Sequence, residues 1–251
     1  MTPDVVVDIG NTRVKWGRCA GTGIAAVAAI PPDPRAWDEQ AAAWNLGRGT
    51  RWAVGGVNPA VAEAVVCWAE AAGGTCAWLR KPSELSIRLA VDEPDAVGID
   101  RVFGALAARS LVPPGTPAVT VDVGTAVTVN LVDAAGMFRG GAIFPGPRLM
   151  GLALHQYTAK LPLVEPTGPS GGRRPATNTT AAIRLGIESA VVGGVNALIS
   201  DCTEAVSVPP RVFITGGGAA VLDDYGLRHL ELVREPALNL IGLRIAADAL
   251  G

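Results

Sequence analysis

Two short segments of the sequence place an aspartate at the end of a β-branched run and a glycine two residues later. Residues 8–12 read DIGNT, and residues 122–126 read DVGTA. Glycine permits a sharp backbone turn, and the N–H groups of such a turn can surround an anion. Each segment therefore predicts an acid-led turn that binds phosphate after a buried strand.

The first turn carries further groups suited to a nucleotide phosphate. Gly10 leaves room for the phosphate, and Asn11 and Thr12 add short side-chain donors. Lys15 supplies a point charge from the following strand. Asp8 has the wrong sign for a phosphate, so its presence predicts a bridging Mg²⁺, which combines a carboxylate with waters and phosphate oxygens.

A single copy of this turn has an ordinary alternative, a hairpin turn in which the aspartate caps the backbone locally. The second copy favours phosphate binding, because two such turns can hold one triphosphate. A third glycine cluster, TGGGA at residues 215–219, also follows a strand, and Gly216 and Gly217 would admit a purine or an α-phosphate. The sequence contains neither GxxxxGK[ST] nor a strand–GxGxxG–helix fingerprint.

Composition indicates a globular protein with a full core. The 251 residues are 49% hydrophobic and 18% charged, with a net charge of −2, which argues against a nucleic-acid or membrane surface. No run of about 18 uncharged apolar residues is present, so we expect no membrane span. The four cysteines form no CxxC pair, which predicts buried, reduced thiols and a cytoplasmic location.

Strand patterns alternate with helix patterns, which predicts the α/β class. We expect strands near residues 5–7, 13–17, 51–57, 118–123, 127–132, 136–143 and 211–215. We expect helices near residues 37–46, 59–72, 102–110, 149–158, 180–202 and 240–250. The Pro/Gly-rich segment 111–117 predicts a boundary between an N-terminal lobe, residues 1–113, and a C-terminal lobe, residues 114–251. Because both lobes open on the same motif, we infer an internal duplication.

The motifs also resemble, in order, those of type III pantothenate kinases. They cover most of the chain, from Asp8 to about Ala219, and read DIGNTRVKW, VGIDR, DVGTAVTVNLV, GGAIFPGPRLM, TAKLPLV, NTTAAIRLG and TGGGA. The resemblance implies the acetate and sugar kinase, heat-shock chaperone and actin superfamily, with two ribonuclease-H-like lobes and a nucleotide cleft between them. It implies ATP-dependent phosphorylation of pantothenate to 4'-phosphopantothenate, the first step of coenzyme A biosynthesis.

The resemblance assigns the substrate motif to residues 98–101. Asp100 would be the general base that accepts the proton of the pantothenate hydroxyl, with Gly98 and Ile99 beside the substrate. Arg101 is a bidentate donor suited to the pantothenate carboxylate or a phosphate oxygen. Taken without the family, the Asp-Arg pair would be a helix cap.

The resemblance assigns three further roles. Asp122 would lie beside a monovalent cation, K⁺ or NH₄⁺, and Thr125 would contact the nucleotide phosphates. Thr179 would bind pantothenate, although the adjacent Thr180 is an alternative and either could be a helix N-cap. One departure is the stretch at residues 90–94, which lacks the tyrosine that many relatives place before GxDR.

The segment 180–202 is apolar on more than one face, which predicts a helix that is buried on all sides or shared with another subunit. Gly193 and Gly194 allow close backbone approach, and the resemblance implies a homodimer with pantothenate at the interface. Two other functions compete: a kinase for a different hydroxyl substrate, and a non-enzymatic regulatory protein on the same fold. The intact Asp8, Asp100 and Asp122 argue against the second.

Overall fold

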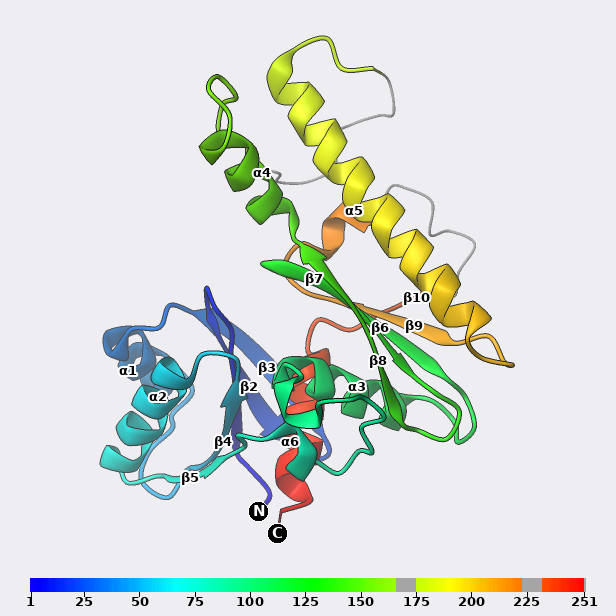
Figure 1. Ribbon diagram of the computed structural model, residues 1–251. Coiled ribbons are helices and arrows are strands. Elements are labelled where there is room, and N and C mark those ends of the chain that lie inside the picture. The colour runs from blue at the N-terminus through cyan, green and yellow to red at the C-terminus, as the bar shows by residue number, and fades with distance from the viewer. Residues whose placement is uncertain (166–174, 223–231, 251) are drawn as a thin grey trace. The chain divides into compact units, whose positions relative to one another are not determined.

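The computed structural model describes residues 1–165, 175–222 and 232–250 (Figure 1). Its contacts divide the chain into two compact units, which we call unit 1 and unit 2. Unit 1 comprises Met1–Pro113, Gly136–Arg139 and Ala237–Gly251. Unit 2 comprises Pro114–Ala135 and Gly140–Pro236. Both units are therefore discontinuous in sequence, and the first break falls between Pro113 and Pro114.

Unit 1 is built on a five-stranded mixed sheet of order β3-β2-β1-β4-β5. The central strand β1 pairs antiparallel with β2 and parallel with β4, and β4 pairs parallel with β5. All five residues of β1 are buried, because helices cover both faces of the sheet. The strands are β1 (Val5–Ile9), β2 (Val14–Ala20), β3 (Gly23–Ile30), β4 (Arg51–Gly56) and β5 (Thr75–Trp78).

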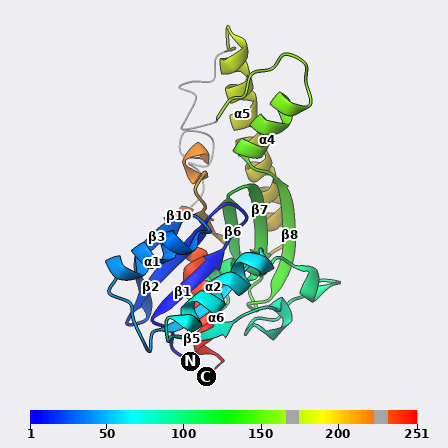
Figure 2. The same cartoon turned by 90° about the vertical axis from the view of Figure 1, so that its left-hand side faces the viewer.

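Helices α1 (Pro34–Ala43) and α2 (Pro59–Ala71) cover one face of this sheet and lie on the viewer's side of it in Figure 2. Each begins with proline after a capping side chain, which is favourable because proline has no N–H to satisfy at the first helical position. The core beneath them is rich in tryptophan. Trp16 lies at its centre, with ring centroids of Trp52 and Trp68 4.9 and 5.6 Å away.

Helices α3 (Ile99–Leu111) and α6 (Leu238–Asp248) pack on the other face. A Cβ on Gly242 of α6 would lie 2.5 Å from the carbonyl carbon of Phe103, so only glycine allows the two helices to approach this closely. Arg244 of α6 is buried, and its guanidinium donates to the carbonyls of Gly21 and Gly23 in the β2–β3 turn. The C-terminal helix thus completes the core of unit 1.

Unit 2 repeats this arrangement with a sheet of order β10-β9-β6-β7-β8. Here β6 pairs antiparallel with β7 and parallel with β9, as β1 does with β2 and β4. The α/β class and the duplicated unit predicted from the sequence are confirmed. The strands are β6 (Ala118–Val123), β7 (Ala126–Val132), β8 (Phe138–Pro145), β9 (Arg211–Thr215) and β10 (Leu232–Arg234).

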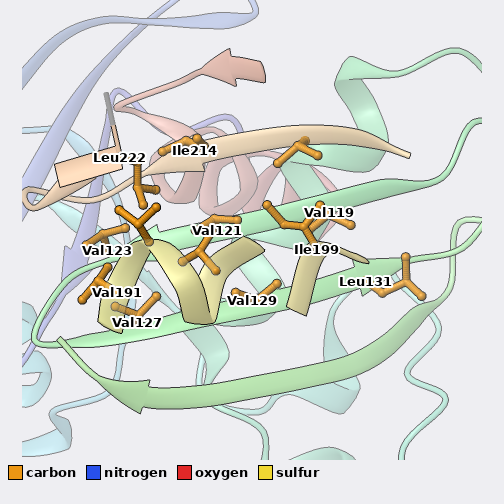
Figure 3. Close-up of a cluster of buried hydrophobic side chains, with 13 residues drawn as sticks. Val119, Val121, Val123, Val127, Val129, Leu131, Val191, Ile199, Ile214 and Leu222 are labelled. Carbon is orange, nitrogen blue, oxygen red and sulfur yellow. The ribbon is translucent and has the colours of Figure 1, made fainter. Parts of the chain in front are cut away.

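Helix α5 (Thr179–Glu204) lies across the unit 2 sheet, with α4 (Pro147–Gln156) beside its N-terminal half. Figure 3 shows Val191 and Ile199 of α5 against Val121 and Val129 of the sheet. Short 3₁₀ turns complete the described elements: η1 (Pro82–Glu84), η2 (Pro94–Ala96) and η3 (Ala219–Leu222).

Among the described residues, α5 is long and apolar enough to cross a membrane by length and composition. That test is weak evidence, because core helices of globular proteins also pass it. Seven of its side chains, including Val191, Val195 and Ile199, are buried in unit 2. We therefore interpret α5 as a core helix.

The cysteines are all free thiols, but they are not uniformly buried. The prediction of burial is wrong for Cys67, which is exposed, whereas the other three cysteines are partly buried. Burial raises the pKa of the Cys19 and Cys76 thiols to about 11, so these two are protonated at neutral pH.

A surface ion pair joins the start of β1 to β4. Arg51 Nη2 lies 2.6 Å from Asp4 Oδ1, and this hydrogen bond lowers the pKa of Asp4 below its ordinary value of 3.8. The Asp4 carboxylate therefore stabilises the fold above about pH 4, and this contribution disappears as the pH falls through the lowered pKa.

We expect Asp4→Asn to lower the melting temperature at pH 7 by only about 1–2 °C, because both partners are exposed to solvent. The difference from the unsubstituted protein should vanish in acid. Thermal melts at pH 7, 4 and 3 measure it. A difference that grows as the pH falls would contradict the assigned direction of the pKa shift.

Candidate active site

The first acid-led turn joins β1 to β2 in unit 1. Asp8 is 6% exposed and pairs with Lys15 across the antiparallel β1–β2 ladder, so their side chains lie on the same face of the sheet. Gly10 N donates to Arg13 O over 3.1 Å, which closes the turn and leaves Asn11 and Thr12 exposed at its tip. Unit 1 thus brings together all five residues predicted for this turn.

The face that carries Asp8 is also the face covered by α3. Gly55 pairs with Asp8 from β4, and a Cβ there would lie 2.6 Å from Cζ of Phe103 in α3. The pair formed by Asp8 and Lys15 therefore lies on the side of the sheet that α3 covers, at the end where β1 and β4 finish. Ligands of parallel α/β sheets commonly bind at this end.

The second acid-led turn joins β6 to β7 in unit 2. Asp122 is half-buried, whereas Gly124 and Thr125 are exposed. Gly124 N donates to Ala126 O over 3.0 Å, the counterpart of the Gly10 bond in the first turn. From the end of β8, Gly146 N donates to Thr125 O over 2.9 Å.

The third glycine cluster lies against this second turn. β9 ends at Thr215, which pairs with Asp122, and Gly218 N donates to Val123 O over 2.8 Å. No atom lies within 4 Å of a Cβ built on Gly217, so this residue faces open space. Unit 2 thus brings together the second acid-led turn and the glycine cluster that is predicted to admit a purine or an α-phosphate.

The segment GGAIFPG has a local role in unit 2. A Cβ on Gly141 would overlap Val129 O and lie 2.7 Å from the Cα of Asn130 in β7. A Cβ on Gly146 would lie 2.6 Å from Thr125 O. These glycines allow β8 and the start of α4 to approach β7 and the second turn.

The substrate motif forms the start of α3. Gly98 is the N-cap and Asp100 lies in the first turn, where its Oδ1 accepts the N–H of Arg101 over 2.9 Å. A Cβ on Gly98 would lie 2.6 Å from the same oxygen. The N-cap of α3 is therefore Gly98 and not the Asp-Arg pair, and Ile99 is buried behind it.

The Arg101 side chain is half-buried at the surface of unit 1. Its guanidinium carbon lies 5.6 Å from the ring centroid of Phe138, within the range of a cation–π contact. Burial lowers the pKa of Arg101 and the nearby Asp100 opposes this effect, so the side chain stays charged. Its charge is therefore partly desolvated, which strengthens pairing with an anion.

Sequence reasoning missed Phe138. It is fully buried at the start of β8, and its carbonyl accepts the N–H of Ala90 over 2.8 Å. The loop that lacks the family tyrosine thus passes beside Phe138. A single aromatic residue before a glycine pair gave no pattern that could have revealed this contact.

Thr179 begins α5, and Asn178 is the N-cap whose Oδ1 accepts the N–H of Ala181 over 2.9 Å. Neither Thr179 nor Thr180 is therefore the capping residue, and both are exposed. Val191 packs with Val123 at the end of β6 and lies twelve residues after Thr179 in α5. Twelve residues of α-helix span about 18 Å. Unit 2 does not bring Thr179 to the second turn. The Gly/Pro-rich sequence of residues 166–178 predicts a polar loop, and residues 166–174 of it lie outside the described residues.

Comparison with known proteins identifies the family. A family profile described as type III pantothenate kinase matches residues 5–201. The chain belongs to this family. A type III pantothenate kinase of Rubrobacter xylanophilus is 34% identical over an alignment of 261 residues that covers 96% of each chain. Another, of Halorhodospira halophila, is 33% identical over 242 residues, covering 87% of this chain and 88% of the relative.

Solved structures support the fold. The ethanolamine utilization protein EutJ from Carboxydothermus hydrogenoformans has a TM-score of 0.56 at 14% identity, covering 97% of this chain and 89% of its own. The Alp12 filament structure has a TM-score of 0.53 at 8% identity and covers both chains fully. The resemblance to type III pantothenate kinases and the actin-like ATPase fold are both confirmed.

Proposed function

We propose that this enzyme transfers the γ-phosphoryl group of ATP to the hydroxyl of pantothenate and forms 4'-phosphopantothenate, the first product of coenzyme A biosynthesis. Membership of the type III family over residues 5–201 carries the proposal. Two duplicated acid-led turns and an aspartate at the start of α3 support it. These are the groups that phosphoryl transfer needs, since its catalysis rests mainly on positioning and charge stabilisation.

In this proposal, the first turn binds the transferring phosphates. The N–H groups near Gly10 and the side chains of Asn11 and Thr12 donate to phosphate oxygens, and Lys15 adds a positive charge. The described residues contain no group of three or more acidic, histidine or cysteine side chains that could hold a metal. Asp8 fits Mg²⁺ nonetheless, because this ion needs few protein ligands when phosphates and waters complete its shell. When bound, Mg²⁺ would offset the phosphate charge.

The second turn holds the nucleotide from unit 2. Thr125 is exposed at the tip of the turn and donates to a phosphate oxygen, and Gly217 of the neighbouring glycine cluster borders the nucleotide. Asp122 is the half-buried acid of this turn, and its carboxylate would lie beside K⁺ or NH₄⁺. A monovalent cation there would reduce charge repulsion near the phosphates.

The start of α3 binds and activates pantothenate. Asp100, in the first turn of α3, accepts the proton of the attacking hydroxyl. Arg101 pairs with the pantothenate carboxylate, and Gly98 leaves space for the Asp100 side chain. Ile99 anchors the helix start in the core. Coenzyme A synthesis from cytosolic ATP, together with the free thiols, is consistent with a cytoplasmic location.

We also propose a homodimer in which α5 of each chain faces the other. The side of α5 away from the core carries small exposed residues at intervals of three or four, which permits close helix packing. They are Ala182, Gly186, Ser189, Ala190, Gly193 and Ala197. Neither Gly186 nor Gly193 has any atom within 4 Å of a built Cβ, so nothing within the chain requires glycine there. Glycine inside a helix costs stability, which a helix–helix contact would offset.

We expect Gly193→Trp to convert the protein to a monomer without unfolding α5, because Gly193 is exposed and a Cβ there meets no atom of its own chain within 4 Å. Sedimentation equilibrium measures the association and circular dichroism the helix content. Gly47→Trp is the control, since Gly47 also faces open space but lies in unit 1. A dimer that survives in Gly193→Trp would place the interface elsewhere.

The proposed activity is tested by ADP release from the purified protein with ATP, Mg²⁺ and pantothenate, in K⁺ and separately in Na⁺. Release that needs pantothenate and K⁺ supports the substrate and the cation together. Release with another hydroxyl substrate and not with pantothenate would indicate a different kinase. No release under any cation would favour the regulatory alternative.

A further inference from the structure

The duplicated sheets place a glycine beside each acid-led turn at the same register position. In unit 1, β4 runs parallel to β1 and pairs Gly56 with Ile9. In unit 2, β9 runs parallel to β6 and pairs Thr215 with Asp122, so the next residues, Gly216 and Val123, are the corresponding pair. Ile9 and Val123 each lie between the aspartate and the glycine of their turn.

Both positions require glycine for the same two reasons. Gly56 has φ = +146° and Gly216 has φ = +97°, conformations that residues with a side chain rarely adopt. A Cβ on Gly56 would lie 2.5 Å from Ile9 N and 2.7 Å from Ile9 C. A Cβ on Gly216 would lie 2.5 Å from Val123 O and 2.6 Å from Val123 C, and would overlap Oδ1 of Asp122. These obstacles are mainly backbone atoms, which have little freedom to move aside.

The same neighbouring strands also hydrogen-bond to the turns. Val57, directly after Gly56, donates its N–H to Ile9 O over 2.8 Å. Gly218, two residues after Gly216, donates its N–H to Val123 O over 2.8 Å. In both units, the residue that follows the aspartate is therefore held by close contact and by a hydrogen bond from the parallel neighbour.

We propose that Gly56 and Gly216 are a matched pair of positioning residues that fix the two acid-led turns, and with them the carboxylates of Asp8 and Asp122. The consequence for catalysis rests on the proposed function, because it assumes that these turns hold phosphates and cations. The three glycines after β9 then have different roles. Gly216 and Gly218 hold the second turn, whereas Gly217 is the glycine that faces open space and a ligand.

Hydrogen–deuterium exchange with mass spectrometry tests the positioning directly in the ligand-free protein. We expect Gly216→Ala to make exchange of the amides at residues 122–126 about tenfold faster, because the turn can no longer pack as before. Gly217→Ala is the matched control and should leave exchange in this segment unchanged. Gly56→Ala should likewise make amide exchange at residues 8–12 faster, and Gly47→Ala is its control. Equal exchange in Gly216→Ala and Gly217→Ala would overturn the proposal.

Kinetics distinguish positioning from a general loss of stability. Gly216→Ala should raise the KM for ATP and the half-saturating K⁺ concentration by about tenfold while changing the KM for pantothenate by less than about twofold. Gly141→Ala is the comparison, because its Cβ would collide with β7 in the same unit but away from Asp122. It should lower the melting temperature without this change in KM values. The same change in Gly141→Ala would reduce Gly216 to a structural residue.

Two further outcomes remain informative. If Gly216→Ala does not fold, Gly218→Ala tests the same contact more gently, since its Cβ would meet Val123 Cγ1 at 3.0 Å and Val123 O at 3.1 Å. Faster exchange of residues 122–126 in that variant would support the proposal, and unchanged exchange would refute it. If the unsubstituted protein shows no pantothenate-dependent ADP release, the proposed function fails, while the exchange experiment still decides the positioning roles.

Discussion

Replacing Asp100 with asparagine is expected to lower kcat by about 10²–10⁴-fold, the usual contribution of a general base. Asparagine keeps the size of the side chain and its Oδ1, which can still accept the Arg101 N–H. The start of α3 should therefore keep its geometry, and the loss should reflect the missing proton acceptor. Steady-state ADP release at saturating ATP and pantothenate measures kcat, and a thermal melt verifies the fold.

Asp95→Asn is a suitable control for Asp100→Asn. Asp95 is an exposed acid in the same connection, and its carboxylate accepts the N–H of Ser83 over 3.2 Å. We expect this variant to keep kcat within about twofold of the unsubstituted protein, because surface changes of this kind have small effects. A kcat for Asp100→Asn as high as that of Asp95→Asn would show that Asp100 is not the base.

The acid-led turns could be predicted from the sequence because all of their information is local. A β-branched run, an acid and a glycine two residues later specify both the strand and the turn that ends it. The motif does not reveal Gly56 or Phe138, because their importance depends on which backbone lies beside them in the folded unit.

β3 shows a different limit of prediction from the sequence. Its residues read GIAAVAAI, and alanine and glycine are disfavoured in strands, so the segment gave no strand signal. It forms a strand because it pairs with β2 along seven register positions. Tertiary pairing thus overrides a weak local preference. The docking of α6 into unit 1 is similarly long-range, since its contacts with α3 and the β2–β3 turn join segments far apart in the sequence.

Mixing two inactive variants should restore activity if each active site is built from two chains. Asp100→Asn removes the proposed base, and Thr179→Val removes the proposed pantothenate contact while keeping the β-branched shape at the start of α5. In a heterodimer of these variants, one site contains both substitutions and the other contains neither. With random assortment, half of the dimers are mixed and about a quarter of all sites are intact.

We therefore expect the mixture, after co-expression or subunit exchange, to reach about a quarter of the activity of the unsubstituted protein, whereas each variant alone is nearly inactive. Mixing Asp100→Asn with Thr180→Val tests whether Thr180 is the pantothenate contact. A shared site is expected because Thr179 lies about 18 Å along α5 from Val191, the residue that packs against Val123. Thr179 is instead near the exposed small residues of α5 that we propose as the dimer interface. If dimers form but activity never exceeds that of the separate variants, Asp100 and Thr179 serve a site within one chain, and the shared-site proposal is wrong.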